Sequence, residues 1–215
     1  MKSFVTTIAL MCGVAPGVAF GQQVMFGQGW KEQRFSMFSS NDYGLNGETL
    51  KVSSDETVSL LWTQLPESLW NKRDVSWDWN VSQSVPPTDL TLKGGDDRNL
   101  SLYFVFLPAD AAEGAKGRGV RSLLNDENAR VMVYVWGGDH DRGDFLESPY
   151  LGDRGRTIIR RSAGTGSASE TVDLAADHRR AFGEEAGSLV GLAVSSDSDD
   201  TGTGVMAELS RLRFQ

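Results

Sequence analysis

Strict alternation of apolar and polar residues marks residues 75–81 as a strand. Val75, Trp77, Trp79 and Val81 fall on one face of that strand, and polar residues fall on the other. A period of two residues is typical of an antiparallel strand with one buried face. The valines beside them indicate that the two tryptophans pack in the core rather than stack against a sugar.

Five further segments predict strands. Residues 100–106 form a near-continuous run of aromatic and branched side chains, which predicts a central strand covered on both faces. Residues 131–136 predict a second strong strand, which two glycines end. Shorter or amphipathic runs predict the remaining strands at residues 157–161, 189–194 and 205–214.

Helical spacing extends over residues 170–185. Leu174, His178 and Phe182 share one face of such a helix, and Gly183 stands where the helix would end. Residues 109–130 predict a long surface connection with a short helical stretch at 120–124, and residues 163–169 predict a flexible loop. Many strands separated by turns, with one short helix, predict an all-β fold: an antiparallel, jelly-roll-like β-sandwich.

The first 21 residues predict a signal peptide. Lys2 precedes an apolar run over residues 4–14, which is shorter than a membrane span, and small residues at positions 19 and 21 suit a cleavage site. We therefore expect residues 22–215 to form a single exported β-sandwich domain, periplasmic or extracellular, without membrane insertion. The one cysteine, Cys12, would leave with the signal, so no disulfide would be available to the exported chain.

The charge balance narrows the choice of partners. The chain has 21 basic and 29 acidic residues, and loss of the signal would leave 20 basic residues and a net charge of about −9. A strongly acidic chain disfavours nucleic acid and anionic lipid. Neutral sugars, cations and other proteins remain as partners.

Two acidic clusters stand at strand junctions in the sequence. Asp96 and Asp97 precede one predicted strand, and Asp197 and Asp199 lie between the last two. Carboxylates in glycine-containing loops suit calcium, so these four and Glu208 of the last strand are candidate metal ligands. The simpler interpretation is that the aspartates are hydrated turn residues and that Glu208 faces solvent.

Aromatic residues supply the candidate ligand-binding positions. Tyr134 and Trp136 share one face of a predicted strand, and Trp136 adjoins a glycine pair at the strand end, where a side chain can reach a rim. The predicted ligand-binding residues are Asp97, Tyr134, Trp136 and Tyr150.

The sequence gives little support for catalysis, and we assign no catalytic residue. It contains neither a Gly-x-Ser-x-Gly elbow nor a His-Glu-x-x-His motif, and its two histidines have no partner that the sequence identifies. Asp97 with Glu147 is the pair that a hydrolase or lyase would use. Any acidic chain offers such pairs, so a non-catalytic role is favoured.

Several short motifs together resemble a known family. In order they are Trp77-Asp78-Trp79, Gly95-Asp96-Asp97, residues 103–106, Tyr134-Val135-Trp136, Ser148-Pro149-Tyr150, residues 177–184 and residues 197–202. Their shared order resembles the exported bacterial family called domain of unknown function 3047. The resemblance implies an exported single β-sandwich akin to galactose-binding-type jelly rolls, and it brings no established activity.

This sequence departs from the family pattern in two places. Asp200 stands where the family-like loop has asparagine, and a tryptophan expected before the helix is replaced within residues 166–169. We expect a non-catalytic domain that binds a glycan or another envelope component, with a structural calcium ion as the candidate cofactor. The alternatives are a carbohydrate-active hydrolase or lyase and a subunit that binds an envelope protein.

Overall fold

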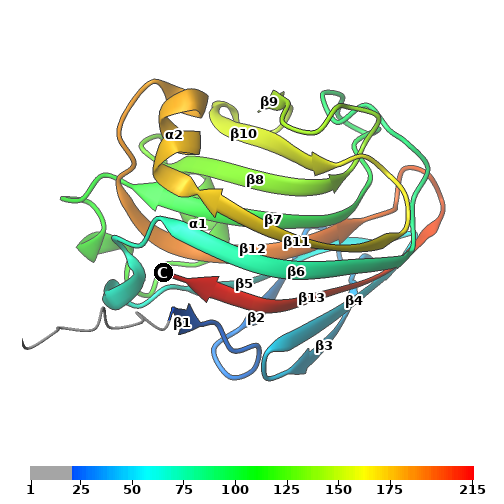
Figure 1. Cartoon of the computed structure of the whole chain (residues 1–215), viewed down its shortest axis with the longest axis horizontal. Helices are drawn as coiled ribbons and strands as arrows, with labels where there is room; N and C mark the ends of the chain where they lie inside the picture. The colour runs from blue at the N-terminus through cyan, green and yellow to red at the C-terminus, as the bar shows by residue number, and fades with distance from the viewer. Residues whose placement is uncertain (1–20) are drawn as a thin grey trace, which may run out of the picture.

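The computed structural model describes residues 21–215, whose strands form two stacked sheets (Figure 1). The six-stranded sheet contains β1 (Gln22–Gln23), β3 (Asp42–Asn46), β4 (Thr49–Asp55), β6 (Asp74–Gln83), β11 (Gly166–Asp173) and β13 (Gly204–Phe214). The seven-stranded sheet contains β2 (Lys31–Arg34), β5 (Val58–Gln64), β7 (Arg98–Leu107), β8 (Arg130–Gly137), β9 (Phe145–Ser148), β10 (Gly152–Arg161) and β12 (Ser188–Asp197). The helical elements are η1 (Glu67–Leu69), η2 (Glu113–Ala115), α1 (Val120–Leu124) and α2 (Leu174–Phe182). The predicted signal peptide lies outside the described residues, apart from Gly21.

The strand order confirms the predicted jelly-roll-like β-sandwich. The six-stranded sheet runs β11-β6-β13-β4-β3, with β1 also on β13, and the seven-stranded sheet runs β2-β5-β12-β7-β8-β10-β9. Neighbouring strands are antiparallel except β8 and β10, which pair in parallel. The chain between these two strands contains β9, which returns to pair antiparallel with β10. The sheet is therefore mixed at this edge.

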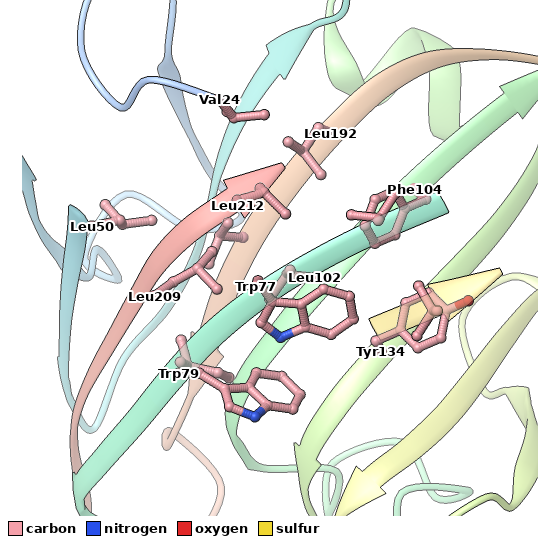
Figure 2. Packing of buried hydrophobic residues seen from close by; sticks show 14 of the residues in the cluster. Val24, Leu50, Trp77, Trp79, Leu102, Phe104, Tyr134, Leu192, Leu209 and Leu212 are labelled. Atoms are coloured by element: carbon pink, nitrogen blue, oxygen red, sulfur yellow. The ribbon is translucent and has the colours of Figure 1, made fainter. Parts of the chain in front are cut away.

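The main core lies between the sheets. Trp77 and Trp79 of β6 point from the six-stranded sheet toward Phe104 and Tyr134 of the facing sheet (Figure 2). The ring centroids lie 5.4 Å apart for the two tryptophans and 5.6 Å apart for Trp77 and Tyr134. Such edge and tilted contacts stabilise aromatic cores beyond simple burial. The predicted inward face of residues 75–81 is confirmed.

A second apolar layer covers the outer face of the seven-stranded sheet. Val105 of β7 and Val131 of β8 pack there against Ala115 and Leu123, which lie in the connection between these strands. The prediction that residues 100–106 are covered on both faces is thus confirmed. The long connection is a cover for the sheet, and its helical stretch at 120–124 is α1.

The segment before α2 differs from the prediction. Residues 166–173 are neither a flexible loop nor the start of a helix, because they pair along their length with β6. Ala168, Glu170 and Val172 alternate toward the interior as a strand requires. Asp173 then caps the helix by accepting hydrogen bonds from the amides of residues 175 and 176, and Gly183 ends it with a positive φ of 72°.

The strands within residues 22–64 and strand β9 were not predicted, although Leu50 and Val52 of β4 alternate with polar residues. Among residues 21–215, neither α-helix has the length and apolar character that crossing a membrane requires.

Candidate functional site

Antiparallel pairing brings the two acidic clusters together. Strand β7 begins where β12 ends, and Arg98 lies opposite Asp197 in the register of these strands. Asp96 and Asp97 therefore meet the loop that follows β12. The two clusters are about a hundred residues apart in the sequence. They lie close together because the start of one strand and the end of its antiparallel neighbour are at the same end of a sheet.

Arg98 donates hydrogen bonds to three polar side chains at this junction. Its Nη1 donates to Asp96 Oδ2 at 2.6 Å, its Nη2 donates to the Tyr103 hydroxyl at 3.0 Å, and its Nε donates to Ser101 Oγ at 2.8 Å. The hydroxyl of Tyr150 donates to the other Asp96 oxygen at 2.8 Å. Asp96 is 3% exposed, so charge-assisted bonds satisfy both of its buried oxygens.

A cavity of about 400 Å³ opens beside this cluster. It lies on the outer face of the seven-stranded sheet, over Tyr103 of β7, Val133 of β8 and Thr157 of β10, which are neighbours in the sheet register. Its apolar lining includes Phe35, Leu90, Leu124, Pro149 and Leu151, and its charged lining is Asp96, Arg98, Asp197, Asp199 and Asp200. The size is that of a small-ligand site.

Tyr150 stands at the cavity with 58% of its surface exposed. Partial burial and its hydrogen bond to Asp96 raise the pKa of Tyr150 to about 12, so the hydroxyl stays protonated at neutral pH and donates. The Lys93 ammonium lies 5.6 Å from the ring centroid. Tyr150, a predicted ligand-binding residue, is the one that the structure places at the cavity.

Asp97 bonds to the loop after β12, unlike its neighbour Asp96. It is fully buried and accepts hydrogen bonds from the amide and hydroxyl of Thr201 at 2.7 and 2.5 Å, and from the amide of Asp200 at 3.3 Å. These bonds fold the loop after β12 onto the start of β7. Asp97 anchors this loop and is not part of the cavity lining.

Asp197 is the most perturbed carboxyl of the site. Burial raises the pKa of Asp197 to about 8 despite the attraction of Arg98, and the negative charges of Asp199 and Asp97 raise it further. Arg98 Nη1 lies 3.4 Å from Asp197 Oδ2, whereas Oδ1 is buried and has no hydrogen-bond partner within residues 21–215. Burial and the charge of Asp199 also raise the pKa of Asp200. A carboxyl poised to hold a proton in a cavity is a feature of functional sites.

The structure places Tyr134 and Trp136, two predicted ligand-binding residues, in the core and not at the cavity beside Arg98. Tyr134 is fully buried between the sheets (Figure 2). Its hydroxyl donates to Asp177 Oδ2 of α2 at 2.7 Å. Trp136 is 3% exposed and packs against Trp79 with ring centroids 5.6 Å apart. The valines of β8 face the opposite side, so the period of the strand directs these two rings into the core.

Two predicted carboxylates lie elsewhere. Glu208 lies in β13 of the other sheet, opposite Lys51 and Asn80, so it does not join the four aspartates. Glu147 lies exposed in β9 and is not part of the cavity lining. The structure therefore does not place the predicted pair of Asp97 and Glu147 together at the cavity.

Arg98 and Tyr103 are site residues that the sequence analysis did not identify. Arg98 is the first residue of a strand and directly follows two aspartates, with either of which it can form an ion pair. This position was the feature of the sequence that could have identified Arg98 as a site residue. Tyr103 lies within an apolar run whose alternation is hidden because both faces are covered.

The fold and the site together define a β-sandwich protein with a small-ligand cavity on the outer face of one sheet. The profile of the family described as "Protein of unknown function (DUF3047)" matches residues 28–213, and the chain belongs to this family. None of the curated proteins is a significant match.

Solved structures with related architecture are distant. The xyloglucanase domain of NopAA, a type three effector from Sinorhizobium fredii, in complex with cellobiose, is 10% identical over 90% of this chain and 99% of its own, with a TM-score of 0.48. A cellulase derived from Cel12A of Rhodothermus marinus is 11% identical over 89% and 97%, with a TM-score of 0.45. The family 11 xylanase from Neocallimastix patriciarum is 13% identical over 87% and 91%, with a TM-score of 0.43. At these TM-scores the fold assignment rests on the sheet topology described above.

Proposed function

We propose that this chain is an exported, non-catalytic carbohydrate-binding domain that holds a glycan in the cavity beside Arg98. The observation that carries the proposal is the exposed ring of Tyr150, whose hydroxyl is fixed by the buried Asp96. Aromatic rings bind the apolar faces of sugars, and a ring held by a buried partner loses little conformational freedom on binding.

The charges of the cavity support a neutral ligand. Four aspartates and one arginine contribute to the lining. Arg98 already donates to Asp96, Ser101 and Tyr103, so little of its hydrogen-bonding capacity is left for an anionic ligand. Carboxylates accept hydrogen bonds from sugar hydroxyls, and an anion would meet excess negative charge.

Apolar side chains surround the remaining volume. Phe35, Leu124 and Leu151 line the cavity. Phe35 directly follows β2 and is half-exposed. A site with mostly apolar walls and a few fixed polar groups suits a ligand that has both C–H faces and hydroxyls. Sugars have this combination.

Export is the second part of the proposal. A charged residue, an apolar run of signal-peptide length and small residues before position 22 support it. An exported sugar-binding domain would meet polysaccharides of the cell envelope or its surroundings. Detection of a mature chain beginning at Gln22 outside the cytoplasm tests this part.

A glycan array with the purified protein tests the proposed ligand class. We expect defined glycans to bind the wild type and to bind Tyr150→Ala about tenfold more weakly or worse. Met206→Ala is the matched control, because Met206 is also exposed but lies on the six-stranded sheet. A wild type that binds no glycan would overturn the proposal and favour an envelope-protein partner.

The position of Asp197 favours a second candidate, a carbohydrate-active hydrolase or lyase, because its carboxyl lines the cavity and its Oδ1 is buried without a hydrogen-bond partner among residues 21–215. A carboxyl that holds its proton at neutral pH is suited to act as a general acid. The assay is release of reducing ends from glycans that bind. Release that Asp197→Asn abolishes would establish catalysis and exclude the non-catalytic proposal, whereas binding without release supports it.

A further inference from the structure

Three carboxylates from two strand junctions converge at the edge of the cavity. Asp97, Asp199 and Asp200 each offer one carboxylate oxygen, and these oxygens all lie within 4.8 Å of one another. Ca²⁺ binds carboxylate oxygens at about 2.3–2.6 Å, so oxygens on opposite sides of one ion are about 5 Å apart. The three groups fit around a single calcium ion without a change of fold.

The loop between β12 and β13 is held in a position that keeps these groups together. Asp97 accepts two short bonds from Thr201 on Oδ2, while Oδ1 accepts only the 3.3 Å bond from the Asp200 amide. Lone pairs of Oδ1 are therefore left for a further partner. The hydrogen bonds from the loop therefore occupy Oδ2 of Asp97 and leave Oδ1 with one long hydrogen bond.

A second, independent observation comes from Asp197. This residue is 7% exposed, and its Oδ1 is buried without a hydrogen-bond partner among residues 21–215. Asp197 lines the cavity together with Asp199 and Asp200. Ionised carboxylates only accept hydrogen bonds, so two that face each other require either a shared proton or a cation between them.

We propose that Asp97, Asp199 and Asp200 bind one Ca²⁺ ion, which compensates the buried, unpaired oxygen of Asp197 beside them and fixes the loop after β12 against the start of β7. This set differs from the one predicted from sequence. Asp96 is excluded because Arg98 and Tyr150 occupy its oxygens, and Glu208 lies on the other sheet.

The donor set favours a hard cation. All three ligands are carboxylates, and the two histidines have other contacts: His140 contacts Asp89, and His178 packs against Phe106. Zinc and other transition metals favour nitrogen and sulfur ligands, whereas calcium favours flexible oxygen ligands from loops. Asp199 and Asp200 line the same cavity as Tyr150, but Tyr150 is not a ligand of the ion, so glycan binding by Tyr150→Ala and Ca²⁺ binding by Asp199→Asn are tested independently.

Calorimetric titration with CaCl₂ after removal of metal by EDTA tests the proposal. We expect one Ca²⁺ per chain, together with a melting temperature that rises with CaCl₂ concentration at constant ionic strength. Asp199→Asn should weaken binding at least tenfold while leaving the melting temperature in EDTA near that of the wild type, because Asp199 is exposed. Glu208→Gln is the control and should respond like the wild type.

Two results would overturn the site. One is an absence of both binding heat and thermal shift in the wild type up to millimolar CaCl₂. The other is a response of Asp199→Asn equal to that of the wild type, which would place the ion elsewhere. Glycan binding by Tyr150→Ala is measured separately and bears only on the sugar proposal.

Discussion

The Tyr150 hydroxyl donates a 2.8 Å hydrogen bond to the carboxylate of Asp96, which lies 54 positions earlier in the chain. This bond joins the turn after β9 to the residues that precede β7, and it fixes an exposed ring beside a buried ion pair. The buried Asp96 is itself held by Arg98. A rigid ring at the rim of a cavity is the feature on which the proposed sugar contact depends.

Two substitutions at position 150 distinguish the contribution of the Tyr150 ring to glycan affinity from that of its hydroxyl. Tyr150→Phe keeps the aromatic face and removes one hydrogen bond worth about 0.5–1.5 kcal/mol, so we expect glycan affinity to fall about threefold. Tyr150→Ala removes the face as well and should lower affinity about tenfold or more. Titration of a glycan that binds the wild type provides the measurement. Equal affinities for Phe and Ala variants would show that the ring makes no contact.

Substitution of Trp136 should change stability and leave glycan binding intact. Because Trp136 is buried against Trp79, Trp136→Ala should lower the free energy of unfolding by about 3–5 kcal/mol. Trp136→Phe retains most of the packing and should cost less. Denaturant unfolding measures the first effect, and the glycan affinity of folded Trp136→Phe measures the second. A large loss of affinity in Trp136→Phe would contradict the core position.

The core positions of Tyr134 and Trp136 could not be predicted from the sequence, for a physical reason. In a strand covered on both faces every position is apolar, so the sequence does not show which face points into the sandwich. In residues 75–81 the polar positions resolve that question, and the prediction for Trp77 and Trp79 is confirmed. Alternation therefore predicts orientation only where one face contacts solvent.

The site was partly predictable for a similar reason. The acidic clusters are visible in the sequence because each lies beside a predicted strand, but only the pairing of β7 with β12 shows that they meet. The cavity was not predictable, because its walls include the connection from residue 108 to residue 130 and the residues after β2. Side chains from such irregular segments carry no periodic signal.

Glu170 should be one of the most sensitive acidic residues of the fold. Its side chain is fully buried, and Arg142 and Arg160 donate to it at 2.8 and 2.7 Å. Burial by itself would raise the pKa of Glu170, but the two arginines hold it below its usual value. Glu170→Gln should lower the free energy of unfolding by about 3 kcal/mol, because it removes the charge of a fully buried carboxylate that two arginines share and leaves both arginines without that partner.

Denaturant unfolding of Glu170→Gln can be compared with that of Glu185→Gln. Glu185 pairs with Arg179 at 3.1 Å on the surface, where such pairs contribute about 0–1 kcal/mol. A cost for Glu170→Gln as small as that for the surface pair would show that water replaces Glu170 as the partner of Arg142 and Arg160.

His178 should make the fold less stable in mild acid. It is 1% exposed, packs between Phe106 and Phe182, and its Nδ1 lies 3.0 Å from the Glu184 carbonyl oxygen. Burial lowers the pKa of His178 below its ordinary value of 6.5, against the hydrogen bond to Glu184, and the charges of Arg130 and Arg73 lower it further. As pH falls below about 6.5, the unfolded chain takes up a proton that the folded chain does not, so stability is lost until the folded pKa is reached.

The measurement is the free energy of unfolding of wild type and His178→Leu from pH 7.5 to pH 5. Asp197, with its pKa raised to about 8, contributes in the opposite direction, because its folded form loses a favourable proton as pH rises. The difference between the two proteins removes that shared contribution. We expect the wild type to lose more stability than His178→Leu on acidification. Parallel pH profiles for wild type and His178→Leu would show that His178 is protonated within the folded core.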